Sequence, residues 1–199
     1  MEYENAQLEV GVPLVVWGAS LTLSRWLEDH WEQLGIEKTS KTLELGSGTG
    51  LLGLYTIKRL LKDSPTASIT MTDMEESSLE LINENIKLNQ INTENAKACY
   101  LKWGSFDSLD GPSSYDLIVG SDIIYSNTIL DSLAQTIAYY LKAGSSGTAY
   151  IANNKVRYDN YGQQFEAMLT KYALKIIERR DIKDDGGFGV MRLLVIKKD

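Results

Sequence analysis

The sequence predicts an α/β protein built on a seven-stranded, mostly parallel sheet, with helices on both faces and an antiparallel last strand. Three observations lead to this fold class. Short apolar segments alternate with amphipathic helical segments, a glycine-rich turn follows the first strand, and only residues 183–189 separate the last two strands. Alternation favours parallel strands joined by right-handed helical crossovers, whereas so short a connection favours an antiparallel hairpin.

The first predicted element is an amphipathic helix that covers the sheet. Its apolar stripe, which Gly35 ends, consists of Leu23, Trp26, Leu27, Trp31 and Leu34. Strands are predicted at residues 42–46, 67–72, 97–102, 115–120, 148–152, 174–181 and 190–197. Helices are predicted at residues 51–62, 129–141 and 161–172, and a further helix carries Leu79, Ile82 and Ile86.

The length fits one domain, because 199 residues lie within the usual range of about 100–200 per domain. We expect residues 1–40 to form an N-terminal cover segment and helix, and residues 41–199 to form the seven-stranded core. Hydrophobic residues (43%) and charged residues (24%) are close to ordinary globular usage, which argues against disorder and disulfide scaffolds.

The net charge and the amino-acid composition narrow the classes of molecule that this protein is expected to bind. A net charge of −7 repels phosphate backbones, so nucleic acid is a disfavoured partner. The N-terminal residues are acidic, Cys99 is the only cysteine, and no apolar run approaches the ~20 residues of a membrane span. We therefore expect a cytoplasmic monomer with neither a membrane nor a nucleic-acid partner.

The single histidine, His30, excludes further chemistry. Zinc sites built on several histidines need more than one histidine, and a Ser-His-Asp triad needs a properly placed partner for its histidine. Neither H-E-x-x-H nor C-x-x-C occurs in this sequence. We expect no metal site, and we expect His30 to lie at the surface or in packing.

A glycine-rich turn follows the first predicted strand, as residues 44–50 read Glu-Leu-Gly-Ser-Gly-Thr-Gly. Ligands of open α/β sheets bind at the carboxyl ends of the strands. Gly46 and Gly48 allow a sharp turn and a close approach to a ligand, and Gly50 allows the next helix to pack on the strand. The spacing G-x-G-x-G differs by one residue from the G-x-G-x-x-G of dinucleotide-binding turns.

Two further residues fit a nucleoside near this turn. Asp73 directly follows the second predicted strand, where a carboxylate can accept hydrogen bonds from ribose hydroxyls. Alternatively, Asp73 and Glu76 form a capping box for the next helix. Trp103, beside Gly104, can border a purine ring, or it can be a core residue.

With these residues, the chain resembles the seven-stranded, Rossmann-like class I methyltransferases that use S-adenosylmethionine. Their first motif, E/D-x-G-x-G-x-G, matches residues 44–50, and their ribose-binding acid matches Asp73. More narrowly, the chain resembles methyltransferase family 16, mainly protein-lysine methyltransferases. The stretches that carry this resemblance are residues 15–20 (Val-Val-Trp-Gly-Ala-Ser), 43–53, 72–74 with Asn83, Asn85 and Asn89, and 122–125 (Asp-Ile-Ile-Tyr).

The resemblance implies a cofactor site at the carboxyl edge of the sheet. It assigns Gly46, Gly48 and the backbone around Ser47 to the methionine part of S-adenosylmethionine, with Glu44 in the same motif. It assigns Asp73 to the ribose, Met74 and Trp103 to the adenine, Trp17 to the lining of the site, and Ser121 to the amino-acid end.

Asp122 and Tyr125 follow the fourth predicted strand, where these enzymes hold the methyl acceptor. An adenine N6-methylating enzyme would show Asn/Asp-Pro-Pro-Tyr/Phe here, and a cytosine C5 enzyme would need a loop cysteine, whereas Cys99 lies in a strand. A carboxylate suits a lysine ammonium instead, and a tyrosine can hold the nitrogen aligned. Alternatively, Asp122 caps the next helical turn and Tyr125 packs.

The sequence therefore predicts an S-adenosylmethionine-dependent protein-lysine N-methyltransferase. By family analogy the substrate is a chaperone or a translation factor, and the acidic charge favours a basic protein surface. The alternatives are a small-molecule N- or O-methyltransferase and a non-catalytic cofactor-binding partner protein. Residues 153–157 and 184–189 are expected in loops at the same rim. There they contact the substrate or, alternatively, are solvated loop residues.

Overall fold

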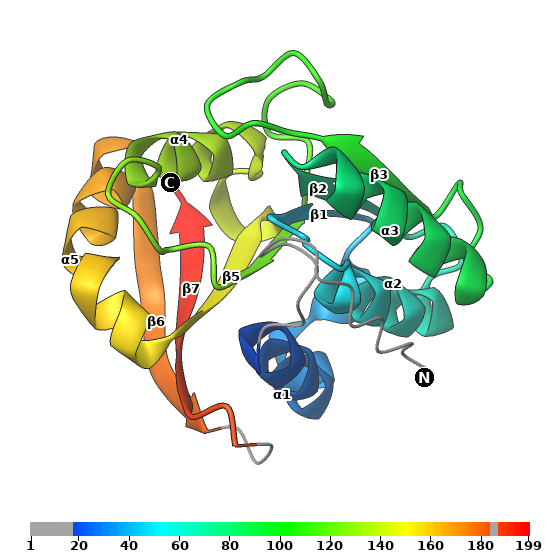
Figure 1. The fold of residues 1–199 in the computed structure, drawn as a ribbon, viewed down its shortest axis with the longest axis horizontal. Coiled ribbons are helices and arrows are strands. Elements are labelled where there is room, and N and C mark those ends of the chain that lie inside the picture. Colours follow the sequence, from blue (N-terminus) through cyan, green and yellow to red (C-terminus); the bar gives the residue numbers. More distant parts are fainter. Residues whose placement is uncertain (1–17, 184–186) are drawn as a thin grey trace.

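The computed structural model describes residues 18–183 and 187–199, and it contains the predicted seven-stranded sheet (Figure 1). The strands are β1 (Lys41–Leu45), β2 (Ser68–Asp73), β3 (Ala96–Tyr100), β4 (Leu117–Ser121), β5 (Thr148–Asn154), β6 (Leu174–Lys183) and β7 (Val190–Lys198). Their order across the sheet is β3-β2-β1-β4-β5-β7-β6. Strands β1 to β5 are parallel, and β7 is antiparallel to β5 and to β6. The predicted fold class, including the antiparallel last strand, is confirmed.

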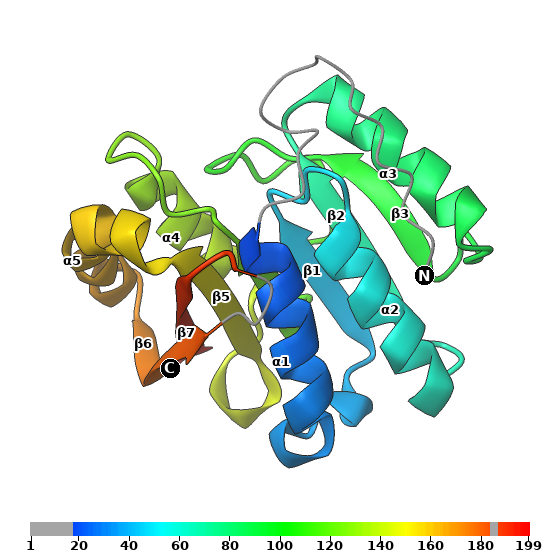
Figure 2. The same ribbon diagram turned by 60° about the horizontal axis from the view of Figure 1, so that its bottom comes forward.

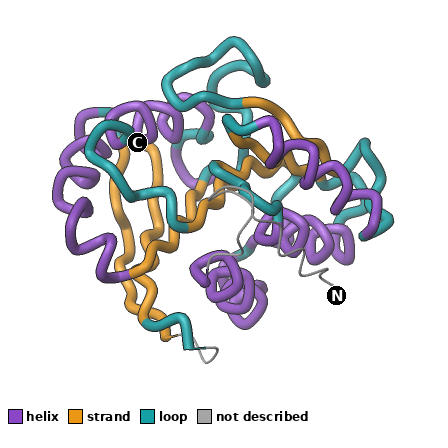
Figure 3. Tube along the Cα trace, viewed as in Figure 1, coloured by secondary structure: helices purple, strands orange, loops and turns teal. Residues whose placement is uncertain are grey.

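Helices cover both faces of this sheet (Figures 2 and 3). They are α1 (Gly18–Leu34), α2 (Leu51–Asp63), α3 (Glu76–Leu88), α4 (Leu130–Tyr140) and α5 (Lys155–Lys171), with short 3₁₀ turns at Ile36–Lys38 and Gly144–Ser146. One buried core joins α1, α2 and α3 to the sheet, and a second joins α4 and α5 to its other face. The prediction of an N-terminal cover helix is confirmed.

The central strands are apolar on both faces because each face meets a core. On β4, Leu117 and Val119 belong to the core under α1, α2 and α3, while Ile118 belongs to the core under α4 and α5. This alternation follows from the two-residue period of a strand. It explains why the strands read as short continuous apolar runs rather than as alternating patterns.

The start of α5 differs from the prediction. The helix begins at Lys155 rather than at residue 161, and β5 continues to Asn154. The Asn154 side chain accepts hydrogen bonds from the main-chain N–H groups of Val156 (3.1 Å) and Arg157 (3.3 Å), so it caps the helix. The expectation of a loop at residues 153–157 is therefore wrong. Residues 184–186 of the other expected loop lie outside the described residues.

The strand order reverses between β1 and β4. From β1 the chain continues to β2 and β3 on one side, and from β4 it continues to β5 on the other. Open α/β sheets form a crevice for ligands outside the carboxyl ends of the strands at such a switch point. The residues that follow β1, β2, β4 and β5 therefore meet around one rim.

Candidate active site

The glycine-rich turn after β1 is fastened to the end of β2. The Ser47 N–H donates to the Thr72 carbonyl oxygen (2.8 Å), and the Gly48 N–H donates to Asp73 Oδ2 (2.9 Å). Gly46 and Gly48 have φ values of +63° and +53°, a region that favours glycine. The structure thus brings together the turn and the acid that the sequence singled out separately.

Asp73 is not the cap of α3. Its Oδ1 accepts the Glu75 N–H (3.1 Å), and the N-cap position is Glu75, with the helix beginning at Glu76. The capping-box alternative is therefore wrong. Both carboxylate oxygens instead shape the corner between the turn and β2, and the neighbouring Met74 side chain is exposed.

Trp103 lies beside the glycine turn. A Cβ atom added to Gly46 would lie 3.3 Å from Trp103 Cζ2 and 2.9 Å from Ile123 Cγ2, an atom of the segment that follows β4. The indole is also partly buried against the core under α4 and α5. Trp103 therefore lies at the edge of this core and also beside the glycine turn at the rim.

Glu44 is a buried acid below the turn. Its Oε2 and the hydroxyl of Ser47 are both buried with no hydrogen-bond partner among the described residues. Burial raises the pKa of Glu44 to about 8, and the nearby Ser47 hydroxyl and Gly53 main chain oppose this only in part. Burial thus favours the protonated form of Glu44.

Gly53 was not singled out from the sequence, yet it sets how closely α2 approaches the sheet. A Cβ atom at Gly53 would lie 2.4 Å from Glu44 Oε2 and 2.6 Å from Met71 Cγ. At Gly50, which was expected to have this role, the nearest atom would be Ile82 Cγ1 of α3 at 3.1 Å. A glycine inside a predicted helix was the available signal, because it marks a close packing contact.

Asp122 completes the pairing between β4 and β5 with its side chain. Its N–H donates to the Ala152 carbonyl oxygen (2.8 Å), as in a regular parallel ladder. In such a ladder the Asn154 N–H would donate to the main-chain oxygen of Asp122, but here it donates to Asp122 Oδ1 (2.8 Å). Asp122 has φ +54°, so the backbone leaves the strand direction at this residue while the carboxylate keeps the last hydrogen bond.

The two oxygens of the Asp122 carboxylate are not equivalent. Oδ1 also lies 3.7 Å from Arg157 Nη1, whereas Oδ2 makes no hydrogen bond or ion pair with any described residue. Burial raises the pKa of Asp122, and the Asn154 N–H and the Arg157 charge oppose that effect. Because α4 begins only at Leu130, Asp122 does not cap a helix. The carboxylate is thus held through Oδ1, and Oδ2 has no partner among the described residues.

Tyr125 lies in the same segment, three residues after Asp122. The residue is 46% exposed, so it is not a core residue. Partial burial raises the pKa of the Tyr125 hydroxyl, and the negative charge of Asp73 adds to this effect. The glycine turn after β1 lies against Ile123 after β4, so the segments that follow these two strands meet at the switch point.

Asn153, another residue that was expected in a loop, is fully buried at the end of β5. Its Oδ1 accepts the Ile124 N–H (2.9 Å), and its Nδ2 donates to the Ile124 carbonyl oxygen (3.0 Å). Sequence reasoning could not have found this contact, because it depends on which residue of β5 lies opposite Asp122.

The remaining predicted residues are placed as follows. Ser121 is the half-buried last residue of β4, and Trp17 lies outside the described residues. His30 stacks on Trp26 with ring centroids 4.5 Å apart, which agrees with a packing role. Within residues 18–183 and 187–199, no group of three or more His, Cys, Asp or Glu side chains could hold a metal ion. None of the helices in this part of the chain combines the length and the apolarity of a membrane span.

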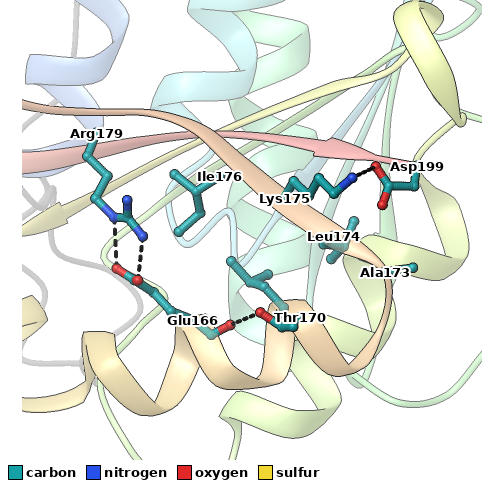
Figure 4. Close-up of a pocket in the computed structure, with 9 residues that line it drawn as sticks. Glu166, Thr170, Ala173, Leu174, Lys175, Ile176, Arg179 and Asp199 are labelled. Atoms are coloured by element: carbon teal, nitrogen blue, oxygen red, sulfur yellow. Dashed lines mark hydrogen bonds and ion pairs between the residues drawn. The ribbon is translucent and has the colours of Figure 1, made fainter.

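A pocket on the far edge of the sheet is separate from this rim (Figure 4). It lies between α5 and β6, and an ion pair between Glu166 and Arg179 crosses it. None of the predicted site residues lines it. The candidate active site is the rim at the switch point, where the residues after β1, β2, β4 and β5 lie.

Comparison with known proteins identifies the family of this chain. A family model described as "Lysine methyltransferase" matches residues 1–171. The chain belongs to the lysine methyltransferase family. A Danio rerio relative, "Protein N-lysine methyltransferase METTL21A", is 33% identical over 178 residues, which cover 87% of this chain and 76% of the relative. "EEF1A lysine methyltransferase 3" of Mus musculus is 31% identical over 163 residues, which cover 81% of this chain and 64% of that protein.

Solved structures show the same fold at low sequence identity. The [4+2]-cyclase SpnF superposes with a TM-score of 0.66 at 12% identity, covering 88% of this chain and 80% of SpnF. TrmN from Thermus thermophilus gives 0.65 at 15% identity, covering 89% of this chain and 48% of TrmN. These likenesses concern the fold alone. Membership of the lysine methyltransferase family is what implies the use of S-adenosylmethionine.

Proposed function

We propose that this lysine methyltransferase transfers a methyl group from S-adenosylmethionine to a lysine amine of a protein, with the cofactor after β1 and β2 and the lysine after β4. The observation that carries the proposal is the Asp122 carboxylate. It is nearly buried and fixed through Oδ1, its Oδ2 has no partner among the described residues, and it lies three residues before Tyr125. A nearly buried carboxylate oxygen without a partner suits a cation that can pair with it.

The residues after β1 and β2 fit the cofactor. Gly46, Gly48 and the Ser47 backbone would hold its methionine part, and Asp73 would accept the ribose hydroxyls through lone pairs that its two backbone N–H donors leave available. The buried Glu44 Oε2 and Ser47 Oγ, which have no partners among the described residues, supply two further polar atoms below the turn.

The ends of the cofactor have candidate contacts as well. Met74 and Trp103 would flank the adenine, because one is exposed directly after Asp73 and the other borders the glycine turn. Ser121, at the end of β4, would lie toward the amino-acid end. Trp17 would line the site from the N-terminal segment, as the family resemblance implies.

The acceptor residues would prepare the lysine for attack. A free lysine ammonium has a pKa of ~10.4 and must lose a proton before its lone pair can react. Asp122 Oδ2 would draw the ammonium into the site, and the Tyr125 ring and hydroxyl would align the nitrogen. The cofactor supplies an electrophilic methyl group on a positively charged sulfur, and this charge and the apolar surroundings lower the pKa of the incoming amine.

The substrate we propose is a protein with a basic surface around the target lysine. The net charge of −7 favours encounter with such a surface. The name of the Mus musculus relative points to a translation factor, EEF1A, as that protein's substrate. A translation factor or a chaperone is therefore the first candidate for this chain, which we propose acts as a cytoplasmic monomer and does not bind nucleic acid.

The test is transfer of tritium from methyl-labelled S-adenosylmethionine to a cell lysate. The proposal predicts a labelled protein band whose acid hydrolysate contains methyllysine. Label only in the small-molecule fraction would indicate a small-molecule N- or O-methyltransferase instead. Cofactor binding by calorimetry without any transfer would indicate a non-catalytic binding protein.

A further inference from the structure

The Asn153 carboxamide forms two hydrogen bonds to a single residue of the acceptor segment. It accepts the Ile124 N–H at 2.9 Å and donates to the Ile124 carbonyl oxygen at 3.0 Å. Both residues are fully buried. Asn153 thus pairs with Ile124 as a neighbouring strand would, at the point where β4 itself has ended.

We infer that Asn153 is a positioning residue for methyl transfer, acting through Ile124 on Asp122 and Tyr125. This inference rests on the proposed function of the site. Asn153 does not touch the proposed position of the lysine. It fixes the main chain between the carboxylate that would receive the ammonium and the tyrosine that would align it.

The end of β5 holds this segment at three successive residues. The Ala152 carbonyl oxygen accepts the Asp122 N–H, the Asn154 N–H donates to Asp122 Oδ1, and the Asn153 side chain binds Ile124. The first two contacts fix Asp122 alone. The third fixes Ile124, the residue before Tyr125, and Tyr125 itself is 46% exposed.

Asparagine is the side chain whose length and chemistry fit this contact. A buried main-chain N–H or C=O without a partner costs ~1–3 kcal/mol, and Ile124 would present one of each. Aspartate matches the shape but cannot donate while it is ionised, serine is shorter and has one polar atom, and glutamine is longer by a methylene group.

The informative variant is Asn153→Asp. When its carboxyl group is protonated, it can both accept from and donate to Ile124, as the amide does. When it ionises, a negative oxygen faces the Ile124 carbonyl oxygen, and the segment must shift. We therefore expect transfer by Asn153→Asp, relative to wild type, to fall as pH rises from 6 to 9, reaching a loss of roughly 10- to 100-fold.

Charged and titratable groups from each neighbouring element act on the new carboxyl group. Asp122, after β4, disfavours its ionisation, whereas Arg157 on α5 and Arg192, opposite Asn153 on β7, favour it. Tyr158, whose ring lies under Arg192, stays neutral between pH 6 and pH 9 because burial raises the pKa of its hydroxyl above the usual value. The midpoint of the loss depends on this balance, but its direction does not, since ionisation always removes the donor.

The measurement is initial-rate tritium transfer to the labelled lysate protein at saturating S-adenosylmethionine, with cofactor affinity determined by calorimetry at each pH. Asn95→Asp is the matched control. Asn95 Nδ2 donates to the carbonyl oxygens of Pro65 (3.0 Å) and Ala67 (2.9 Å), away from the rim. That variant loses the same kind of contact, so we expect lower stability but a rate relative to wild type that does not change with pH.

Asn153→Ser keeps the test decisive if the aspartate variant unfolds at high pH. Serine is uncharged, so it should slow transfer by a similar factor at every pH while cofactor affinity stays unchanged. Transfer by either Asn153 variant at the wild-type rate throughout, or a fall in cofactor affinity that parallels the rate, would overturn the positioning role. If wild type labels no protein, the proposed function itself fails, and the inference fails with it.

Discussion

The two halves of the candidate site are built in different ways. The half after β1 and β2 is a continuous glycine turn fastened to Asp73, and main-chain N–H groups provide most of its shape. The half after β4 is a short segment that has left the sheet, and side chains hold it against β5. Both halves need a positive φ, which glycine supplies in the first and Asp122 in the second. The comparison suggests that cofactor capture and amine acceptance can be disrupted separately.

The largest effect is expected from Asp122→Asn. Asparagine tolerates φ +54° and can still accept the Asn154 N–H, but it lacks the charge that would receive an ammonium. We expect methyl transfer to fall by on the order of 100-fold or more, with cofactor affinity unchanged by calorimetry.

Asp122→Ala tests whether the Asp122 side chain completes the pairing between β4 and β5, which Asp122→Asn preserves. Alanine leaves the Asn154 N–H without its acceptor and places an ordinary residue at positive φ. We expect an additional loss of stability of about 1–3 kcal/mol in chemical denaturation. Equal stability of the two variants would mean that Asp122 does not complete the ladder.

Asp73→Asn tests the cofactor half. The amide oxygen can still accept the Gly48 N–H, whereas the amide nitrogen cannot accept the Glu75 N–H. The charge-assisted hydrogen bonds to a ribose, worth ~1.5–3 kcal/mol, are weakened. We expect S-adenosylmethionine affinity to fall roughly 10- to 100-fold, with little change in the rate at saturating cofactor. Unchanged affinity in a folded protein would remove Asp73 from the site.

Tyr125→Phe should have a smaller effect on the acceptor half. It removes the hydroxyl but keeps the ring, so we expect transfer to fall about 10-fold. Rates of the phenylalanine variant and Asp122→Asn on the same substrate provide the comparison. A phenylalanine variant with the wild-type rate would assign the alignment to the ring alone.

Glu44→Gln should change how the stability of the protein depends on pH. The pKa of Glu44 is raised from 4.5 to about 8 in the folded protein, so the folded state keeps a proton that the unfolded state loses above 4.5. The contribution of Glu44 to the free energy of unfolding is therefore fully present below pH 4.5. It is lost as pH rises toward 8, by up to about 1.4 kcal/mol per pH unit. Denaturation of the cofactor-free protein at pH 5, 6, 7 and 8 should show this slope in wild type and not in Glu44→Gln. The same slope of stability against pH in both proteins would contradict a raised pKa of Glu44.

The two halves also differ in how far the sequence could predict them. The glycine turn and Asp73 are recognisable because their residue types are local signals at the ends of predicted strands. Asp122 and Tyr125 could be chosen only through a family resemblance. Asn153 could not be chosen at all, because its role depends on the β4–β5 register. The start of α5 was missed for a local reason, as the Asn154 cap precedes a turn with little apolar content.

The most direct test measures cofactor affinity and saturated transfer rate side by side for Asp73→Asn and Asp122→Asn. We expect a crossed result. Asp73→Asn should bind S-adenosylmethionine weakly and transfer at nearly the wild-type rate once saturated, whereas Asp122→Asn should bind it normally and transfer slowly. If Asp122→Asn binds the cofactor normally and methylates the substrate protein at the wild-type rate, the division of the candidate site into a cofactor half and an acceptor half is wrong.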